Sequence, residues 1–562
     1  MLNFQLFLVL FSALVIFSFA VAFVPIAGVD EGRFAQASIN MIKSGDWFIP
    51  QVDGSLRLEK PIFFYWEQAF SFIIFGQNEF AARLASVLSG TALVALAYFM
   101  GSIQGTALTA ALICLSTLII NIFSKVAIID MSLCFFISAT LSFFFLSYFF
   151  KTRTNNIFNR QSSDTRIYFY LASFFASIGF LTKGPVALLL PAMVIFIFLL
   201  KEKELIIFFS HKKYDSITCI LMFLLINVPW YLLAHIKTQG EFTQGFFLGD
   251  NLNRFFETTS NHGGAIWYYV PVIFIGFFPW SFFLIQALLN DQSSSKVSRI
   301  NITDNTNTLR RFNLIWIIVG FTFFSLAQTK LVTYILPISL PLILTLAKYW
   351  SVKMNAGRAF QGKNYDVLGG LLALFICFPL VLLYILDKLS NSLKAELVGD
   401  LQFFLVVIGI IFSCILIIAM TSVKTNLKLA FGLLFFFSLI LYVSSTELIA
   451  KPLVNNLDGG IKKFCKEIYI PQNIKKGRVA KQRRSKKASI NTFNLNRASI
   501  GFYCSEKVHN FTEISRLEER LQSNKEAYII TKNSELDKVK NSLSKAHKVL
   551  LKSDKYTFLK VY

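Results

Sequence analysis

Ionisable side chains gather between positions 25 and 78, in a stretch that separates two apolar runs. Charges at a membrane edge are costly and are candidates for function. Basic groups there suit a phosphate on a lipid, and carboxylates suit a cationic sugar, a metal ion or a general base. The alternative is that these charges only cap and anchor interfacial helices. They are Asp30, Glu31, Arg33, Glu59 and Lys60.

Apolar runs of about 20 residues, each long enough to cross a bilayer, recur through the first 450 positions. Of the 562 residues, 55% are hydrophobic and 15% are charged, against about 25% charged in a soluble protein. This composition predicts a polytopic α-helical membrane protein and excludes a disordered chain, a disulfide scaffold and a cytosolic nucleic-acid binder. About thirteen spans are expected, at 4–24, 79–100, 105–124, 131–150, 167–182, 185–200, 216–234, 267–289, 312–328, 331–348, 366–386, 400–421 and 427–447.

The distribution of positive charge predicts which side of the membrane each connection faces. Four connections are rich in Lys and Arg, at 151–166, 201–215, 290–311 and 348–365. All four follow even-numbered spans, so the positive-inside rule makes that side cytoplasmic. The N-terminus is then cytoplasmic, and the first loop lies outside. Further ionisable residues at span edges fall on the same outer side: Lys125, Asp130, Lys183, Arg254, His262 and Lys330.

The elements that must position the first charged cluster are two amphipathic helices. Helical spacing of apolar residues runs through Arg33–Lys43, and a second such piece, rich in Phe, covers Pro61–Phe75. Helices of this kind lie along a membrane surface. The loop 25–78 is therefore expected to place its charges at the boundary between water and lipid.

The segment 451–562 is predicted to be a separate soluble α+β domain that follows the transmembrane domain 1–450. It holds 25 Lys and Arg against 10 Asp and Glu, a charge that suits anionic lipid head groups or only reflects a Lys-rich composition. Short β-like runs occur at 527–530 and 556–559, and a helical stretch lies near 512–522.

Three further features of the tail leave questions open. The run 475–487 is too highly charged to pack and is expected to be an exposed loop. Cys465 and Cys504 both lie in the tail. If the tail lies outside the cytoplasm the two thiols are able to pair, and otherwise they are ordinary thiols.

An ordered series of motifs over about residues 1–350 resembles the bacterial ArnT-type glycosyltransferases, which are relatives of protein O-mannosyltransferases with the GT-C fold. A single Asp-Glu pair would be weak evidence, but the series keeps its order and spacing. It comprises Asp30-Glu-Gly-Arg33, Ser-Gly-Asp-Trp47, Glu59-Lys60-Pro61, Asn78-Glu-Phe-Ala-Ala-Arg83, Leu181-Thr-Lys183-Gly-Pro185, Pro229-Trp-Tyr231, Trp267-Tyr-Tyr269, Pro279-Trp280 and Lys330-Leu-Val-Thr-Tyr334-Ile-Leu-Pro337.

The resemblance implies an inverting enzyme of the bacterial inner membrane, acting as a monomer at the periplasmic face. Its donor would be a sugar on undecaprenyl phosphate, usually 4-amino-4-deoxy-L-arabinose, although some relatives move galactosamine or other hexoses. Its acceptor would be a phosphate of lipid A. The C-terminal domain would be periplasmic, and no nucleic acid would be bound.

The resemblance also suggests roles for individual residues of this chain. Asp30 is implied as the main carboxylate of the site, with Glu31 and Asp130 as further catalytic candidates. The donor phosphate would be bound by Lys60, with Arg33, Arg254, Lys183 and Lys330, and Tyr334 would line the pocket. Glu59 and His262 match positions that hold a divalent metal, zinc or magnesium, although two ligands are too few for a structural zinc site.

Three other functions compete with this hypothesis. One is an enzyme of the same fold that glycosylates a protein or another glycan, and one is a transporter or flippase of lipid-linked sugars. Transporters place charges near the bilayer midplane, often in inverted repeats, whereas the charges here fall at one surface. A sensor with a lipid-binding tail would not explain the ordered motifs.

Overall fold

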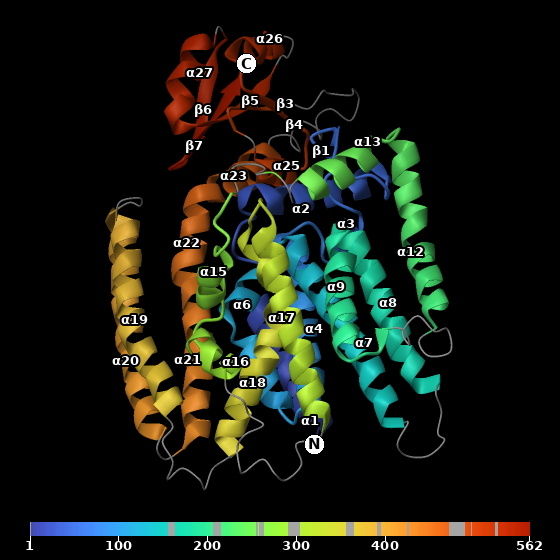
Figure 1. Ribbon diagram of the computed structural model, residues 1–562. Helices are drawn as coiled ribbons and strands as arrows, with labels where there is room; N and C mark the ends of the chain where they lie inside the picture. The colour runs from blue at the N-terminus through green and yellow to red at the C-terminus, as the bar shows by residue number, and fades with distance from the viewer. Residues whose placement is uncertain are drawn as a thin grey trace.

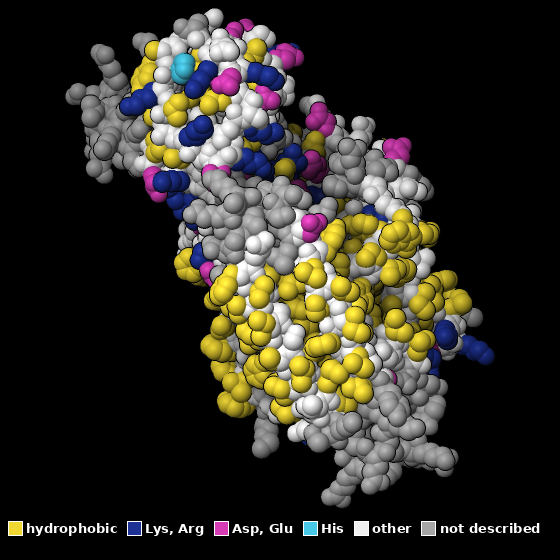
Figure 2. Space-filling model, turned by 90° about the vertical axis from the view of Figure 1, so that its left-hand side faces the viewer, with side chains coloured by type: hydrophobic (Ala, Val, Ile, Leu, Met, Phe, Trp, Pro, Cys, Tyr) yellow, Lys and Arg dark blue, Asp and Glu magenta, His cyan; other side chains and the backbone are white. Residues whose placement is uncertain are grey.

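A bundle of long helices carries a small mixed domain at one end, with the N-terminus at the opposite end (Figure 1). The computed structural model describes residues 2–154, 163–205, 215–253, 257, 263–289, 304–355, 365–390, 395–423, 426–470, 489–495, 497–522, 526–543 and 545–562. On the face that Figure 2 shows, hydrophobic side chains cover much of the bundle, and charged side chains concentrate on the end domain and beneath it. This division matches a multi-pass membrane protein with one water-facing domain.

Eight helices within the described part of the chain are long and apolar enough to cross a membrane. They are α4 (Glu79–Ile103), α7 (Ile129–Thr154), α12 (Ser216–Lys237), α17 (Asp304–Leu326), α18 (Ser339–Asn355) with the preceding 3-10 helix η4 (Val332–Ile338), α19 (Tyr365–Ser390), α20 (Ala395–Ser422) and α21 (Leu427–Ser445). A polytopic helical fold is thereby confirmed, whereas the predicted count of thirteen spans is not.

The remaining predicted spans are helical but shorter, less apolar or broken. One candidate is bent by 111° between α15 (Tyr269–Gly276) and the pair η2 (Trp280–Phe283) and α16 (Leu284–Leu289). The others are α1 (Leu2–Ser18), α5 (Ala107–Leu115), α6 (Leu118–Phe123), α8 (Ser163–Lys183) and α9 (Val186–Lys201). The predicted span 105–124 is divided into α5 and α6 at Ser116 and Thr117, where the backbone of Thr117 is extended, with φ −85° and ψ 125°.

The two helices predicted in the first loop are both present. They are α2 (Gly28–Ser44) and α3 (Phe63–Phe75), separated by the antiparallel hairpin of β1 (Gln51–Val52) and β2 (Ser55–Leu56). The middle of α2 is buried on every side, since all residues from Phe34 to Ile39 are buried, and the helix lies across the end of the bundle (Figure 1). Gly45 ends α2 in the left-handed conformation, φ 73°, which favours glycine.

A helical stem connects the last membrane helix to the end domain. After α21 the chain continues without a break through η5 (Thr446–Ala450), α22 (Lys451–Val454), η6 (Asn455–Gly459), α23 (Gly460–Lys463) and η7 (Phe464–Tyr469). The expected junction at position 450 therefore falls inside a helical run. The loop expected at 475–487 lies outside the described residues.

The end domain is built on a five-stranded sheet in the order β4-β3-β5-β7-β6. Its elements are β3 (Ser489–Phe493), α25 (Ala498–Cys504), β4 (Val508–Phe511), α26 (Ile514–Gln522), β5 (Ala527–Lys532), η8 (Asn533–Glu535), α27 (Leu536–Ser542), β6 (His547–Lys552) and β7 (Tyr556–Val561). β3 runs parallel to β4 and β5, and β7 is antiparallel to β5 and β6. The two strands and the helix predicted in this tail are confirmed as β5, β7 and α26.

One face of the sheet packs against the first loop, so the C-terminal domain covers α2. One hydrophobic cluster joins Ile530 and Phe558 of the sheet to Ile39 of α2 and Phe72 of α3. The burial of such a shared apolar surface makes the two parts one packed unit. The tail is therefore separate in sequence but not in packing.

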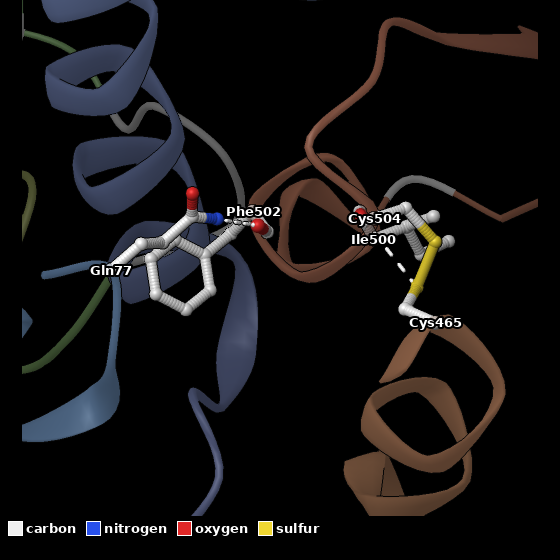
Figure 3. The surroundings of a disulfide bond; sticks show 5 residues. All are labelled: Gln77, Cys465, Ile500, Phe502 and Cys504. Carbon is white, nitrogen blue, oxygen red and sulfur yellow. Dashed lines mark hydrogen bonds between the residues drawn. A yellow bond between two sulfur atoms is a disulfide. The ribbon is translucent and has the colours of Figure 1, made fainter. Parts of the chain in front are cut away.

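Polar contacts also join the C-terminal domain to the bundle near the start of α2. The Tyr503 hydroxyl donates to Glu79 Oε1 at 2.9 Å and accepts from the backbone N–H of Ile26 at 2.7 Å. Lys462 of the stem pairs with the same Glu79 oxygen at 2.7 Å. A disulfide joins Cys465 of the stem to Cys504 at the end of α25, so the two thiols do pair (Figure 3).

Candidate active site

A cavity of about 380 Å³ opens between the outer-loop segments and the ends of several membrane helices. The loop before α3, the end of α8, the start of α9, the π-helix η1 (Gln244–Asn253) and η4 all contribute to its wall. Its polar lining comes from Lys60, Lys183, Asp250, Asn251, Thr329 and Tyr334, and the remainder is apolar, including Leu133, Val186, Leu189, Phe247, Phe323 and Phe324. A wall of this kind suits a ligand with a charged head and an apolar tail.

Two ion pairs bring four charges to this cavity. Lys60 Nζ lies 3.0 Å from Asp250 Oδ2, with only 14% and 12% of the two side chains exposed. Lys183 pairs with Oδ1 of Asp130, and these side chains are 14% and 13% exposed. Because both pairs are shielded from water, their charges act more strongly than surface pairs do.

Tyr334 connects the second ion pair to the cavity wall. Lys183 Nζ lies 4.6 Å from the centre of the Tyr334 ring, a cation–π contact that fixes the direction of the ammonium group. The structure therefore brings together four of the predicted site residues: Lys60, Lys183 and Tyr334 on the wall, and Asp130 beside Lys183. They come from segments far apart in sequence.

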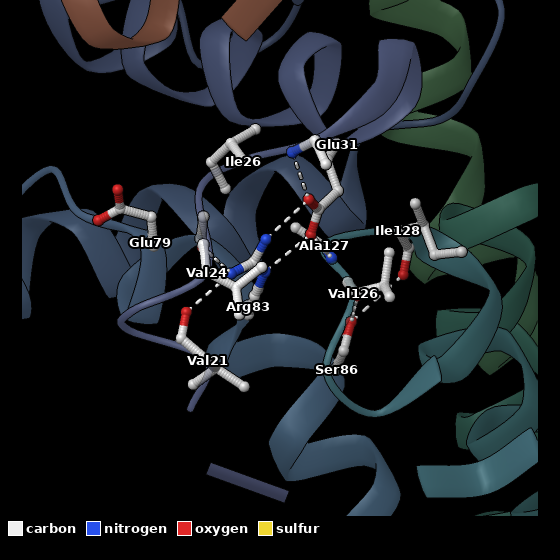
Figure 4. A network of polar contacts seen from close by, with 12 residues as sticks. Val21, Val24, Ile26, Glu31, Glu79, Arg83, Ser86, Val126, Ala127 and Ile128 are labelled. Atoms are coloured by element: carbon white, nitrogen blue, oxygen red, sulfur yellow. Dashed lines mark hydrogen bonds and ion pairs between the residues drawn. The ribbon is translucent and has the colours of Figure 1, made fainter. Parts of the chain in front are cut away.

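Glu31 lies in a buried network that holds the chain in place. Arg83 donates to both carboxylate oxygens of Glu31, from Nε at 2.8 Å and Nη2 at 2.9 Å, and also donates to the carbonyls of Val21, Val24 and Pro25. The backbone N–H groups of Ala27 and Ala127 complete the coordination of Glu31 at 2.9 and 2.7 Å. Figure 4 shows the network between the start of α2 and the loop before α7.

Both carboxylate oxygens of Glu31 are occupied by hydrogen bonds within this network. Each accepts one hydrogen bond from Arg83 and one from the backbone, and the side chain is almost fully buried. Neither residue lines the cavity. The geometry supports a positioning role for Glu31 rather than the catalytic one that the sequence suggested.

The other predicted residues lie around the cavity or outside the described part. Asp30 is exposed and Arg33 is half-buried on α2, and neither lines the cavity. Lys330 is buried and donates to the carbonyls of Ser325 and Ala327, so its ammonium group caps the end of α17. Arg254 and His262 lie outside the described residues.

The metal prediction gains no ligand set from the described residues. Glu59 is half exposed and its carboxylate lies 3.9 Å from Arg57 Nη2. Among the residues that the structure describes, no three His, Cys, Asp or Glu side chains are grouped to hold an ion. The predicted partner His262 is outside those residues, so the metal site stays a prediction.

Asp250 and Asn251 line the cavity but were not identified from the sequence. Both lie on η1, shortly after Phe246 and Phe247 in sequence. The rings of these two residues pack with Tyr231 and Phe242 and so hold the π-helix in place. The available signal was an acidic residue one turn before Arg254, shortly after the Phe246-Phe247 pair. π-helical turns often occur at functional sites.

Comparisons with known proteins agree with this architecture. Residues 5–240 match the family model described as dolichyl-phosphate-mannose-protein mannosyltransferase. The chain is 31% identical over 427 residues to the undecaprenyl phosphate-alpha-4-amino-4-deoxy-L-arabinose arabinosyl transferase of Serratia proteamaculans, covering 74% of this chain and 71% of the relative. The enzyme of the same name from Yersinia enterocolitica is 31% identical over 57% of this chain and 54% of its own length.

Solved structures show the same fold over almost the whole chain. The crystal structure of ArnT from Cupriavidus metallidurans bound to undecaprenyl phosphate superposes with a TM-score of 0.75, covering 99% of this chain and 97% of that one at 18% identity. The apo form of that protein gives 0.74. At this identity the likeness concerns the fold.

Fold, cavity and relatives together define a membrane protein of the GT-C class, related to protein O-mannosyltransferases. Within that class, the chain belongs to the family of undecaprenyl phosphate-aminoarabinose arabinosyl transferases. The chain spans 54% of the length of the Yersinia enterocolitica relative, and 64% and 62% of two further relatives, from Aeromonas hydrophila and Proteus mirabilis.

Proposed function

We propose that this protein is an inverting membrane glycosyltransferase that moves an amino sugar, such as 4-amino-4-deoxy-L-arabinose or galactosamine, from undecaprenyl phosphate to a phosphate of lipid A. The observation that carries the proposal is the cavity with two shielded cations, Lys60 and Lys183, above an apolar wall. A polyprenyl phosphate has this combination of an anionic head and an apolar chain. The names of the relatives support the same donor.

Each group in the cavity has a place in the proposed reaction. Lys60 binds the donor phosphate and stabilises the negative charge that grows on it as the glycosidic bond breaks. Lys183, held by Asp130 and the Tyr334 ring, adds a second positive charge on the same wall. The apolar residues of α9 and α17 contact the prenyl chain.

The acceptor needs no strong base. A phosphate monoester has a second pKa of about 6, so its oxygen is largely anionic at neutral pH and attacks the anomeric carbon directly. Displacement from the side opposite the leaving phosphate inverts that carbon. Asp30 stabilises the positive charge that develops on the sugar ring or positions the acceptor.

The protein acts in the bacterial inner membrane, with its N-terminus in the cytoplasm and its tail in the periplasm. Two observations support this orientation. The chain ends lie at opposite ends of the bundle (Figure 1), and the tail contains the disulfide between Cys465 and Cys504, a bond that persists in oxidising compartments.

Labelling of introduced cysteines tests this orientation. Single cysteines at Asp130, Lys183 and Lys330 should react with a membrane-impermeant thiol reagent added from the periplasmic side, after the tail has been unfolded to expose them. A cysteine at Lys353, beside the 356–364 connection, should react only from the cytoplasmic side. Reaction of the first three from the cytoplasm would contradict the orientation.

The function itself is tested by mass spectrometry of lipid A from cells with and without the protein. A mass increment that depends on the protein and equals one amino sugar on a phosphate is expected. An increment for a neutral hexose would change the sugar. Unchanged lipid A, together with a glycosylated protein or other glycan, would show that the acceptor is not lipid A. Accumulation of donor on the cytoplasmic side in cells that lack the protein would indicate a flippase.

A further inference from the structure

Lys60 and Asp250 form a pair of opposite charges on the cavity wall, and the two residues come from different parts of the chain. Lys60 precedes α3 in the first loop, and Asp250 lies on η1, 190 residues later. Lys60 Nζ and Asp250 Oδ2 are 3.0 Å apart, and both side chains are largely buried. Both line the cavity, so a ligand that enters it meets a cation and an anion side by side.

A donor phosphate that takes Lys60 removes this cation from Asp250. A carboxylate in a partly dry site that loses a paired cation raises the free energy of the complex. We infer that Asp250 recognises the ammonium group of the donor sugar, which replaces Lys60 at the carboxylate when Lys60 turns to the phosphate. This inference rests on the proposed function and adds to it a residue that selects the class of sugar.

The exchange keeps every charge in the cavity compensated. An amino sugar on a phosphate is a zwitterion, with its amine and its phosphate on different carbons of one ring. One internal ion pair is replaced by two pairs with the ligand. A neutral sugar offers no cation to take the place of Lys60 at Asp250, so its binding is less favourable than that of an amino sugar.

Asp130 is a weaker candidate for the same task. Asp250 lines the cavity, whereas Asp130 does not. Asp130 holds Lys183, and that ammonium group is also held by the Tyr334 ring at 4.6 Å. Asn251, next to Asp250, also lines the cavity and gives η1 a further polar group there.

The test compares three purified full-length variants in lipid vesicles: Asp250→Asn, Asp250→Glu and Asp130→Asn. The ligands are undecaprenyl phosphate carrying the amino sugar, the same donor with its amine acetylated, and undecaprenyl phosphate alone. In Asp250→Asn, kcat/KM for the amino-sugar donor should fall about 10- to 100-fold, as expected for loss of a charged hydrogen bond. Its ratio to kcat/KM for the acetylated donor should fall by a similar factor, and Asp250→Glu should restore part of it.

Binding of the sugar-free lipid provides a readout that a structural role would not give. Asp250→Asn should bind undecaprenyl phosphate as tightly as the wild type or more tightly, because Lys60 is released for the phosphate. The matched control Asp130→Asn should lower turnover of both donors without changing their ratio.

Two results would overturn the inference. One is an unchanged preference for the amino sugar in Asp250→Asn, and the other is an equal loss of affinity for all three lipids. Failure of the proposed function would give a different result, because the wild-type protein would then transfer neither sugar to lipid A. Binding of the three lipids is measured separately and does not depend on transfer.

Discussion

Replacement of Arg83 by methionine is expected to lower the free energy of unfolding by about 3–5 kcal/mol, the cost of breaking a buried ion pair from one side. Arg83 uses all of its donor nitrogens: two hydrogen bonds go to Glu31, and three go to the carbonyls of Val21, Val24 and Pro25. Methionine fills similar space but leaves the Glu31 charge buried without its cation.

The loss should be measured as the midpoint of thermal unfolding of the purified protein in detergent. The matched control is Lys237→Met, which removes an exposed partner from Asp46 at 3.3 Å, where the side chains are 42% and 30% exposed. Exposed pairs contribute about 0–1 kcal/mol, so this control should unfold close to the wild type. Equal midpoints for Arg83→Met and Lys237→Met would show that the network around Glu31 contributes little.

The network also determines where α2 begins, and therefore where Asp30 stands. Glu31 follows Asp30 directly, and its carboxylate is held from α4, from the turn at Ala27 and from the loop at Ala127. From the other side, Tyr503 accepts the Ile26 N–H. The first turn of α2 is thus fixed between the bundle and the tail, and this gives Asp30 the rigid position that its proposed role requires.

Elements whose pattern is local were predictable from the sequence. Both first-loop helices show amphipathic spacing, and β5 and β7 are short β-branched and aromatic runs. The division of the span 105–124 was not predictable from hydropathy, because the apolar run is continuous. It follows from the extended backbone of Thr117, which no apolar pattern shows.

The cavity was predicted in part, for a similar reason. Lys60, Asp130, Lys183 and Tyr334 were identified by type and motif, but their pairing was not, since ion pairs between distant segments leave no mark in spacing. Asp250 was missed because its contact with Lys60 forms only when η1 folds against the first loop. Glu31 was assigned to catalysis because the sequence does not show that Arg83, 52 positions later, occupies both its oxygens.

The exposed carboxylate of Asp30 leads to the second large effect. Asp30→Asn should lower kcat by roughly 100- to 1,000-fold, the range for loss of one preorganised electrostatic contact. The substitution keeps the shape of the side chain, and Asp30 takes no part in the Glu31 network or the cavity wall, so folding and donor binding should be retained. Stopped reactions with purified lipid A would give kcat, and binding of undecaprenyl phosphate would give the affinity.

The pH dependence then separates the two tasks that Asp30 is able to perform. If the acceptor phosphate is the nucleophile, the wild-type rate should fall below about pH 6 as that phosphate takes up its second proton. Asp30→Asn should keep this profile at a lower level, because the titrating group belongs to the lipid. A wild-type profile controlled by a single carboxylate, and absent in Asp30→Asn, would instead make Asp30 a general base and require a hydroxyl as the acceptor.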